Sequence, residues 1–123
     1  MANAVVGDEI YGDDPTTNKL QEDMAKILGK EAALMTPSGT QANLISMMLI
    51  CKQKGETVIF GDECHIAHYE RGGVGSIASI MPTVLPNELD GTIDLKKIAK
   101  AAAIAPINDP HIVKVRGISL ESS

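Results

Sequence analysis

Residues 36–43 read Thr-Pro-Ser-Gly-Thr-Gln-Ala-Asn and lie between a short apolar run and the clearest helical pattern of the chain. The apolar run, residues 32–35, predicts a buried strand. The helical pattern covers residues 41–54 and ends before Gly55, with an apolar stripe made by Leu44, Ile45, Met48 and Leu49. A strand that leads directly into a helix is typical of an α/β fold.

The rest of the chain continues this alternation of helices and strands. A helix is expected to begin at Pro15, capped by Asp14, and to end at Gly29. Its apolar residues recur at helical spacing: Leu20, Met24, Ile27 and Leu28. Further helices are predicted over residues 64–71 and 95–103, the second capped by Asp94, further strands over 57–60, 76–85 and 112–120, a turn over 87–91, and irregular structure over 104–115. Because the short strands are apolar on both faces, we expect an α/β fold with a mostly parallel sheet and flanking helices.

Composition limits the possible partners. The chain has 123 residues, of which 44% are hydrophobic and only 2% aromatic, so its core is expected to be aliphatic and rich in methionine. The net charge is −5, and no run of Lys or Arg occurs, which argues against nucleic acids and anionic membranes as main partners. The longest apolar stretch, residues 44–51, is much shorter than the ~20 residues that span a membrane.

The two cysteines, Cys51 and Cys64, allow one disulfide by arithmetic. The first residues show no apolar signal segment, so we expect a cytoplasmic location, where thiols stay reduced.

Residues 38–40, Ser-Gly-Thr, stand where a helix is predicted to begin. The first N–H groups of a helix have no partner inside the helix, and with the helix dipole they favour an anion. Ser38 and Thr40 would add hydroxyl donors, and Gly39 would let the backbone come close. The simpler interpretation is that Ser38 only caps the helix, and the local pattern does not decide between the two.

Two other stretches contain groups that bear chemistry. Residues 62–70 could form a metal site from Cys64, His65 and His68, although no second cluster of ligands completes it. They could also place the flat ring of His65 beside a bound cofactor, or form a solvated loop with His65 as a cap. Tyr11, in the Gly- and Asp-rich stretch 7–15, is either a packing anchor or a hydroxyl at a site.

Seven short stretches point to one family when they are taken together and in order: 6–16 (Val-Gly-Asp-Glu-Ile-Tyr-Gly-Asp-Asp-Pro-Thr), 29–34 (Gly-Lys-Glu-Ala-Ala-Leu), 37–44 (Pro-Ser-Gly-Thr-Gln-Ala-Asn-Leu), 61–66 (Gly-Asp-Glu-Cys-His-Ile), 70–73 (Glu-Arg-Gly-Gly), 90–95 (Asp-Gly-Thr-Ile-Asp-Leu) and 118–121 (Ile-Ser-Leu-Glu). On these stretches the chain resembles the low-specificity L-threonine aldolases, which are pyridoxal-phosphate enzymes of fold type I, the aspartate-aminotransferase fold. The stretch 7–15 favours the aldolases over the cysteine desulfurases and β-eliminating lyases of the same fold. The resemblance covers residues 1–121 as part of the large, cofactor-binding domain, incomplete at both ends relative to the family, and residues 122–123 do not match.

The resemblance implies a role for each candidate residue. Ser38, Gly39 and Thr40 would bind the phosphate of pyridoxal 5'-phosphate, and His65 would stack on its ring. Tyr11 would lie close to the cofactor or substrate, and Glu70 would lie near the site. The reaction would be retro-aldol cleavage of L-threonine or L-allo-threonine to glycine and acetaldehyde. A dimer of dimers, with no metal, is the expected assembly.

The departures from the family are equally informative. In the family, the lysine that forms the Schiff base lies in a Ser-Lys-Gly stretch, and none of the lysines here has such a context. The acid that pairs with the pyridinium nitrogen and the arginine that binds the substrate carboxylate also lie further along the family sequence. The family continues from Leu-Glu into Asn-Thr-His, whereas this chain reads Ser122-Ser123. We therefore expect the chain alone to be inactive. The alternative is a non-catalytic chain that binds a phosphate ligand or pairs with full-length subunits.

Overall fold

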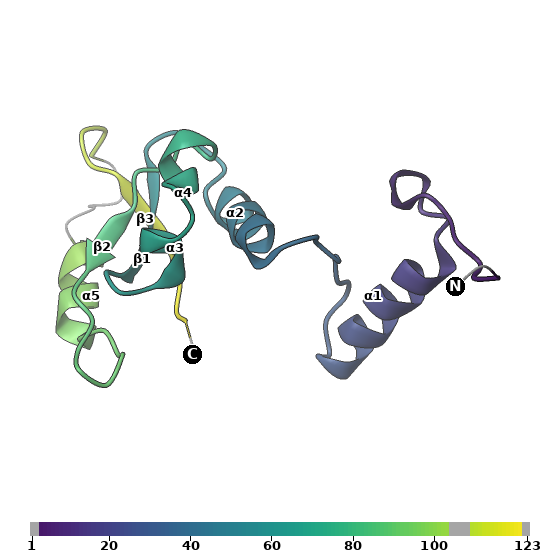
Figure 1. Cartoon of the computed structure of the whole chain (residues 1–123). Helices are drawn as coiled ribbons and strands as arrows, with labels where there is room; N and C mark the ends of the chain where they lie inside the picture. Colours follow the sequence, from purple (N-terminus) through teal and green to yellow (C-terminus); the bar gives the residue numbers. More distant parts are fainter. Residues whose placement is uncertain (1–2, 104–108, 122–123) are drawn as a thin grey trace. The chain divides into compact units, whose positions relative to one another are not determined.

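The computed structural model describes residues 3–103 and 109–121, and the chain divides into two units, Met1–Pro37 and Ser38–Ser123. Each unit has its own elements, which Figure 1 colours along the chain.

The first unit contains η1 (Glu9–Tyr11) and α1 (Pro15–Ile27). The Asp14 carboxylate accepts the N–H of Thr17 at 2.7 Å and that of Gly7 at 3.0 Å, which confirms Asp14 as the cap of this helix. These bonds, the one from Thr17 first, lower the pKa of Asp14. A Cβ at Gly7 would collide with the backbone of Asp13, so this tight turn requires glycine.

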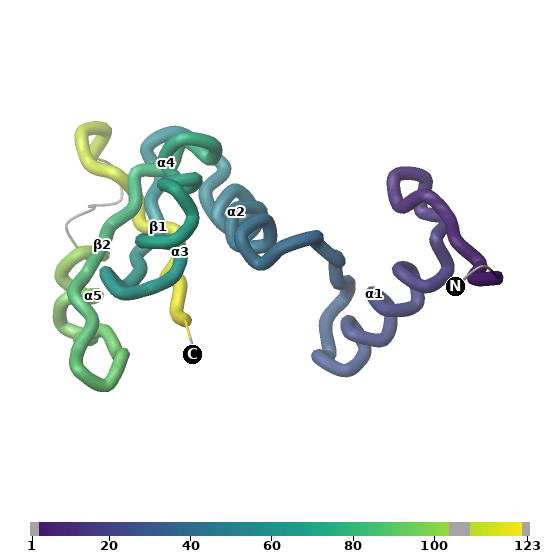
Figure 2. The backbone as a smooth tube through the Cα atoms, in the orientation of Figure 1, coloured from purple at the N-terminus to yellow at the C-terminus, as the bar shows by residue number. Residues whose placement is uncertain are grey.

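Residues 32–35 do not form the buried strand that the sequence predicts. After α1 the chain turns at Gly29 and runs back beside the helix (Figure 2), but it pairs with no described strand. The N–H of Met35 instead donates to Oε1 of Gln21 at 2.9 Å, and the Leu34 and Met35 side chains are exposed. An apolar run becomes a strand only where a sheet edge is available to it.

The second unit is built on a three-stranded parallel sheet of order β2-β1-β3: β1 (Glu56–Gly61), β2 (Thr83–Leu85) and β3 (Lys114–Ile118). All six residues of β1 are buried, as expected of a central strand. The register shifts between Thr57 and Val58, so Arg116 is an extra residue in β3. The sheet confirms the predicted fold class.

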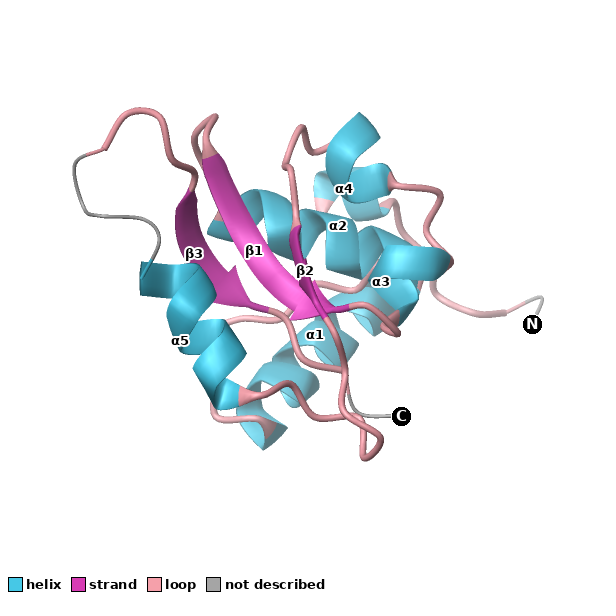
Figure 3. Cartoon of the chain, turned by 90° about the vertical axis from the view of Figure 1, so that its left-hand side faces the viewer, coloured by secondary structure: helices cyan, strands magenta, loops and turns pink. Residues whose placement is uncertain are grey.

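Helices cover both faces of this sheet (Figure 3). On one side lie α2 (Gly39–Ile50), α3 (His65–His68) and α4 (Gly73–Ser76), and on the other lies α5 (Leu95–Ala103). The buried cluster between the sheet and helices α2, α3 and α4 consists of aliphatic and sulfur-containing side chains with one phenylalanine: Met47, Cys51, Val58, Phe60, Ile66, Val74 and Ile80. Both cysteines are free thiols.

Several elements differ in extent from their predictions. Helix α2 begins two residues earlier and ends at Ile50, and its buried residue is Met47, whereas Met48 and Leu49 are exposed. This helix is apolar on nearly every side, so periodicity alone does not identify the buried face. Strand β3 is shorter than the predicted 112–120.

The predicted strand over residues 76–85 is wrong except for its last three residues. Residues 73–76 form α4, and β2 begins only after Pro82, which has no N–H for a ladder bond. Before it, Ser79 adopts a left-handed conformation (φ 57°), and Ile80 donates its N–H to the carbonyl of Val74 at 2.9 Å. This segment is therefore a packed loop.

Helix α5 has the predicted bounds and the turn over 87–91 is present, whereas the predicted 64–71 helix is shorter, because α3 covers only residues 65–68. Of the irregular stretch 104–115, residues 104–108 lie outside the described part, and residues 114–115 belong to β3. No helix in the described residues is long and apolar enough to cross a membrane.

Candidate functional site

The N-terminus of α2 begins the candidate site. Oγ of Ser38 accepts the N–H of Gln41 at 3.1 Å, so Ser38 does cap the helix, as the simpler interpretation predicts. Capping does not use the N–H groups of Gly39 and Thr40, which stand in the first turn and have no acceptor within the helix. This end of α2 keeps both donors and the positive end of the helix dipole.

A pocket of about 410 Å³ opens at this helix end. Its volume lies in the range of roughly 300–1,000 Å³ that is usual for small-molecule sites. Three segments of the second unit line it: Gly39, Thr40 and Asn43 from α2, Cys64, His65 and Ile66 after β1, and Ser119, Leu120 and Glu121 after β3. The last two segments follow the carboxyl ends of parallel strands, which is where open α/β sheets bind ligands.

His65 is held by two carboxylates. Its backbone N–H, at the start of α3, donates to Oε2 of Glu121 at 2.6 Å. Its ring nitrogen Nδ1 lies 3.0 Å from Oε1 of Glu70. The side chain of His65 is 50% exposed, whereas that of Glu70 is only 3% exposed. The ring of His65 is therefore half-exposed, and its Nδ1 contacts a buried carboxylate.

Asn43 completes this arrangement. Its Nδ2 donates to Oε1 of Glu70 at 2.7 Å, so α2 and the histidine segment meet at one carboxylate oxygen. Asn43 lies three residues after Thr40, on the same side of α2. Neither Asn43 nor Glu121 is among the site residues predicted from the sequence, although both stand in the stretches that carry the family resemblance.

The metal interpretation of residues 62–70 is not supported. In the described ranges, no three His, Cys, Asp or Glu side chains are placed to hold an ion. The thiol of Cys64 donates to the carbonyl of Gly61 at 2.9 Å, and burial raises its pKa, which keeps it protonated. The rings of His65 and His68 instead flank Tyr69, with centroids 5.3 and 5.9 Å from it.

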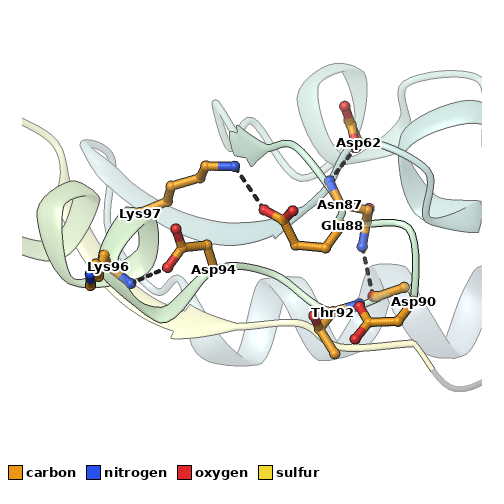
Figure 4. A network of polar contacts seen from close by, with 9 residues as sticks. Asp62, Asn87, Glu88, Asp90, Thr92, Asp94, Lys96 and Lys97 are labelled. Carbon is orange, nitrogen blue, oxygen red and sulfur yellow. Dashed lines mark hydrogen bonds and ion pairs between the residues drawn. The ribbon is translucent and has the colours of Figure 1, made fainter.

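Asn87 forms hydrogen bonds with residues 62–63, which lie shortly before His65, and Figure 4 shows its contact with Asp62. Its N–H donates to Oδ1 of Asp62 at 2.7 Å, its Oδ1 accepts the N–H of Glu63 at 3.0 Å, and its Nδ2 donates to the carbonyl of Gly91 at 2.9 Å. A Cβ at Gly61 would collide with the Asn87 amide, so the last position of β1 needs glycine.

The network continues towards α5, where two further contacts hold the helix start (Figure 4). The N–H of Lys96 donates to Oδ1 of Asp94 at 2.7 Å, which confirms Asp94 as the cap, and Lys97 pairs with Glu88 at 2.9 Å. Since both ions of that pair are partly exposed, the pair contributes little to stability.

Of the predicted site residues, Gly39, Thr40 and His65 line one pocket, Ser38 caps the helix beside it, and Glu70 lies behind His65. Tyr11 belongs to the other unit, and its side chain is 81% exposed. Its place beside a cofactor stays a prediction.

The family model of the β-eliminating lyases matches residues 1–123. The chain belongs to this family. The β-eliminating lyases are pyridoxal-phosphate-dependent enzymes. The cofactor class of the family agrees with the one that the resemblance implies.

Low-specificity L-threonine aldolase 1 of Arabidopsis thaliana is 48% identical over 123 residues, covering 100% of this chain and 34% of that protein. The low specificity L-threonine aldolase of Escherichia coli K12 is 42% identical over 123 residues and is covered to 36%. The crystal structure of a putative L-allo-threonine aldolase from Listeria monocytogenes superposes with a TM-score of 0.64 at 26% identity, covering 85% of this chain and 27% of that one. The chain thus spans about a third of the length of these curated relatives.

Proposed function

We propose that the pocket at the start of α2 is the phosphate end of a pyridoxal-phosphate site of the kind that serves a β-hydroxy amino acid of the threonine type. One observation carries this proposal. Gly39, Thr40 and His65, which the resemblance assigns to the cofactor from separate stretches of sequence, line the same pocket.

The donors around the pocket fit a phosphate. The N–H groups of Gly39 and Thr40 and the hydroxyl of Thr40 supply hydrogen bonds at the positive end of α2. Apart from its chain neighbours and the adjacent backbone of α2, a Cβ added at Gly39 would meet no described atom within 4 Å, so the backbone is open to an approaching oxygen. Among the described residues, Glu121 is the one carboxylate that lines the pocket, and it accepts the N–H of His65.

When bound, the cofactor withdraws electrons from the substrate amino acid, so that a bond at its α-carbon breaks. The residues of this chain would bind and orient the cofactor. The start of α2 would hold the phosphate, and the ring of His65 would orient the cofactor ring. Asn43 and Glu70 hold the ring of His65 in turn.

None of the nine lysines, all of which lie in the described residues, lines the pocket. We therefore expect this 123-residue chain to bind the phosphate end of the cofactor without cleaving threonine. Acetaldehyde release from L-threonine and L-allo-threonine by the pure chain with pyridoxal phosphate is the assay. Release that disappears when the cofactor is removed would contradict this expectation.

Binding is best tested with pyridoxine 5'-phosphate, because it has no aldehyde and cannot react with surface lysines. Isothermal titration should show binding of pyridoxine 5'-phosphate and of inorganic phosphate, but none of pyridoxine. Removing the hydroxyl in Thr40→Val should weaken binding about tenfold or more, since a hydrogen bond to a charged group is worth about 1.5–3 kcal/mol.

Thr16→Val is the matched control, since Thr16 is the second residue of α1 as Thr40 is of α2. Equal binding of pyridoxine and its phosphate, or equal losses in the two variants, would overturn the phosphate assignment.

A second candidate function is association with longer subunits. Its support is an exposed apolar groove of about 280 Å³ in the first unit, lined by α1 and residues 33–35: Leu20, Gln21, Met24, Leu28, Ala33, Leu34 and Met35. Native mass spectrometry of the chain mixed with a full-length threonine aldolase tests it. Mixed oligomers that are lost in Met24→Glu but kept in Lys19→Glu would support association, whereas separate species would exclude it.

A further inference from the structure

Two side-chain nitrogens converge on a single oxygen behind the pocket. Oε1 of Glu70 accepts Nδ2–H of Asn43 at 2.7 Å and lies 3.0 Å from Nδ1 of His65. The three residues come from α2, from the first position of α3 and from the segment after α3. The ring of His65 is thus tied to α2 through one buried carboxylate.

The chemistry of this oxygen decides where the histidine proton lies. An ionised carboxylate only accepts hydrogen bonds, whereas a neutral imidazole has one donor nitrogen and one acceptor nitrogen. Glu70 is almost completely buried, and a buried charge has to be paired. Its Oε1 already accepts from the Asn43 amide, so the contact with His65 is satisfied when Nδ1 carries the proton.

The other end of the histidine is open. His65 lines the pocket, and in the described part of the structure no hydrogen bond to its Nε2 is found. The backbone of His65 is anchored separately, through its N–H to Glu121. His65 is therefore held at Nδ1 of its ring and at its backbone N–H, while Nε2 is accessible from the pocket.

We propose that Glu70, held in place by Asn43, keeps the proton of the neutral His65 ring on Nδ1, so that Nε2 is the acceptor nitrogen of this ring. A free histidine ring in water favours the opposite neutral tautomer, with its proton on Nε2. Glu70 is thus a positioning residue: it sets the tautomer and the plane of the ring that faces the pocket. The functional meaning of this tautomer rests on the proposed cofactor site, but the tautomer itself is a property of this chain.

The test is a pH titration of the ¹⁵N-labelled chain without cofactor, followed in long-range ¹H–¹⁵N spectra. The chain has three histidines, and His65→Phe and His68→Phe variants assign their signals. For His65, Nδ1 should stay at a protonated shift throughout, and Nε2 should move to the unprotonated shift as the pH rises. A neutral His65 that carries its proton on Nε2 would overturn the proposal without any mutation at Glu70.

Variants at Glu70 separate the carboxylate from packing. Glu70→Leu removes the acceptor at similar size, and the neutral ring should then shift to the Nε2–H tautomer while His68 is unchanged. Should Glu70→Leu lose the dispersed spectrum of a folded chain, Glu70→Gln is read instead. Its neutral amide should lower the share of the Nδ1–H form. A His65 tautomer unchanged in the folded variant would overturn the proposal.

The same samples distinguish this inference from the proposed function. If His65 holds Nδ1–H but pyridoxine 5'-phosphate does not bind, only the cofactor site fails. If pyridoxine 5'-phosphate binds but His65 holds Nε2–H, only the role of Glu70 fails.

Discussion

Glu121 accepts the backbone N–H of His65 at 2.6 Å, although the two residues are 56 positions apart. Glu121 follows β3, and His65 begins α3 after β1. The parallel pairing of β1 with β3 brings the two together, and the acid then fixes the histidine at its backbone. The side chain of the preceding cap residue, Cys64, accepts no hydrogen bond from the first N–H groups of α3.

Glu121→Ala should therefore loosen the start of α3. The N–H of His65 would pass from a carboxylate to water, so its amide hydrogen should exchange more quickly, while amides in β1 stay protected. Hydrogen exchange followed by NMR measures both. Glu63→Ala is the control, because Glu63 is exposed and close in sequence. Equal exchange at His65 in both variants would show that Glu121 does not anchor it.

Acid should destabilise the second unit through Glu56. Its carboxylate accepts the N–H groups of Lys52 and Gln53 at 2.7 and 3.0 Å, and Nε of Arg116 lies 3.2 Å away. The backbone bonds, the one from Gln53 first, hold the pKa of Glu56 below its ordinary value of 4.5. A lowered native pKa adds stability above the ordinary value, and this contribution is lost as the pH falls through the lowered one.

The urea concentration at the unfolding midpoint should consequently decrease as the pH is lowered below about 4.5. Glu56→Gln should start with a lower midpoint and depend less on pH in this range. Glu63→Gln should follow the wild-type curve. Parallel curves for wild type and Glu56→Gln would contradict the assignment.

Two adjacent methionines of α2 should differ sharply in their effect on stability. Met47 is 3% exposed and packs in the buried cluster, whereas Met48 is 49% exposed. Met47→Ala should cost about 2–5 kcal/mol, because the removed atoms leave a cavity. Met48→Ala should stay within about 0.5 kcal/mol. Urea unfolding measures both, and similar losses would mean that the buried face of α2 is assigned incorrectly.

Gly61→Ala should disturb the loop before His65. The new Cβ would meet the amide of Asn87, which would have to withdraw from the N–H of Glu63. We expect a loss of about 1–3 kcal/mol, as for other overpacked positions. Gly75→Ala is the control, since a Cβ added there would meet the Ile80 carbonyl oxygen at an ordinary 4.0 Å. Unfolding midpoints that fall equally in both variants would contradict this close approach.

Local chemistry in the sequence was enough to predict several elements. Asp14 and Asp94 accept N–H groups of the helices that follow them, and β1 is buried on both faces, as its apolar composition indicates. The start of α2 beside the pocket follows from the same reasoning about unpaired N–H groups. Each of these features depends on residues within a few positions of one another.

The sequence by itself thus determined the caps, the central strand and the helix start that offers donors to an anion. Only the tertiary structure decided which side of the apolar helix α2 is buried, that residues 32–35 pair with no described strand, and that Asn43 and His65 share one oxygen of Glu70. The reason is physical: a cap or a helix start is satisfied by its neighbours in the chain. Burial, strand pairing and the position of a histidine proton depend on groups that only the folded chain brings into contact.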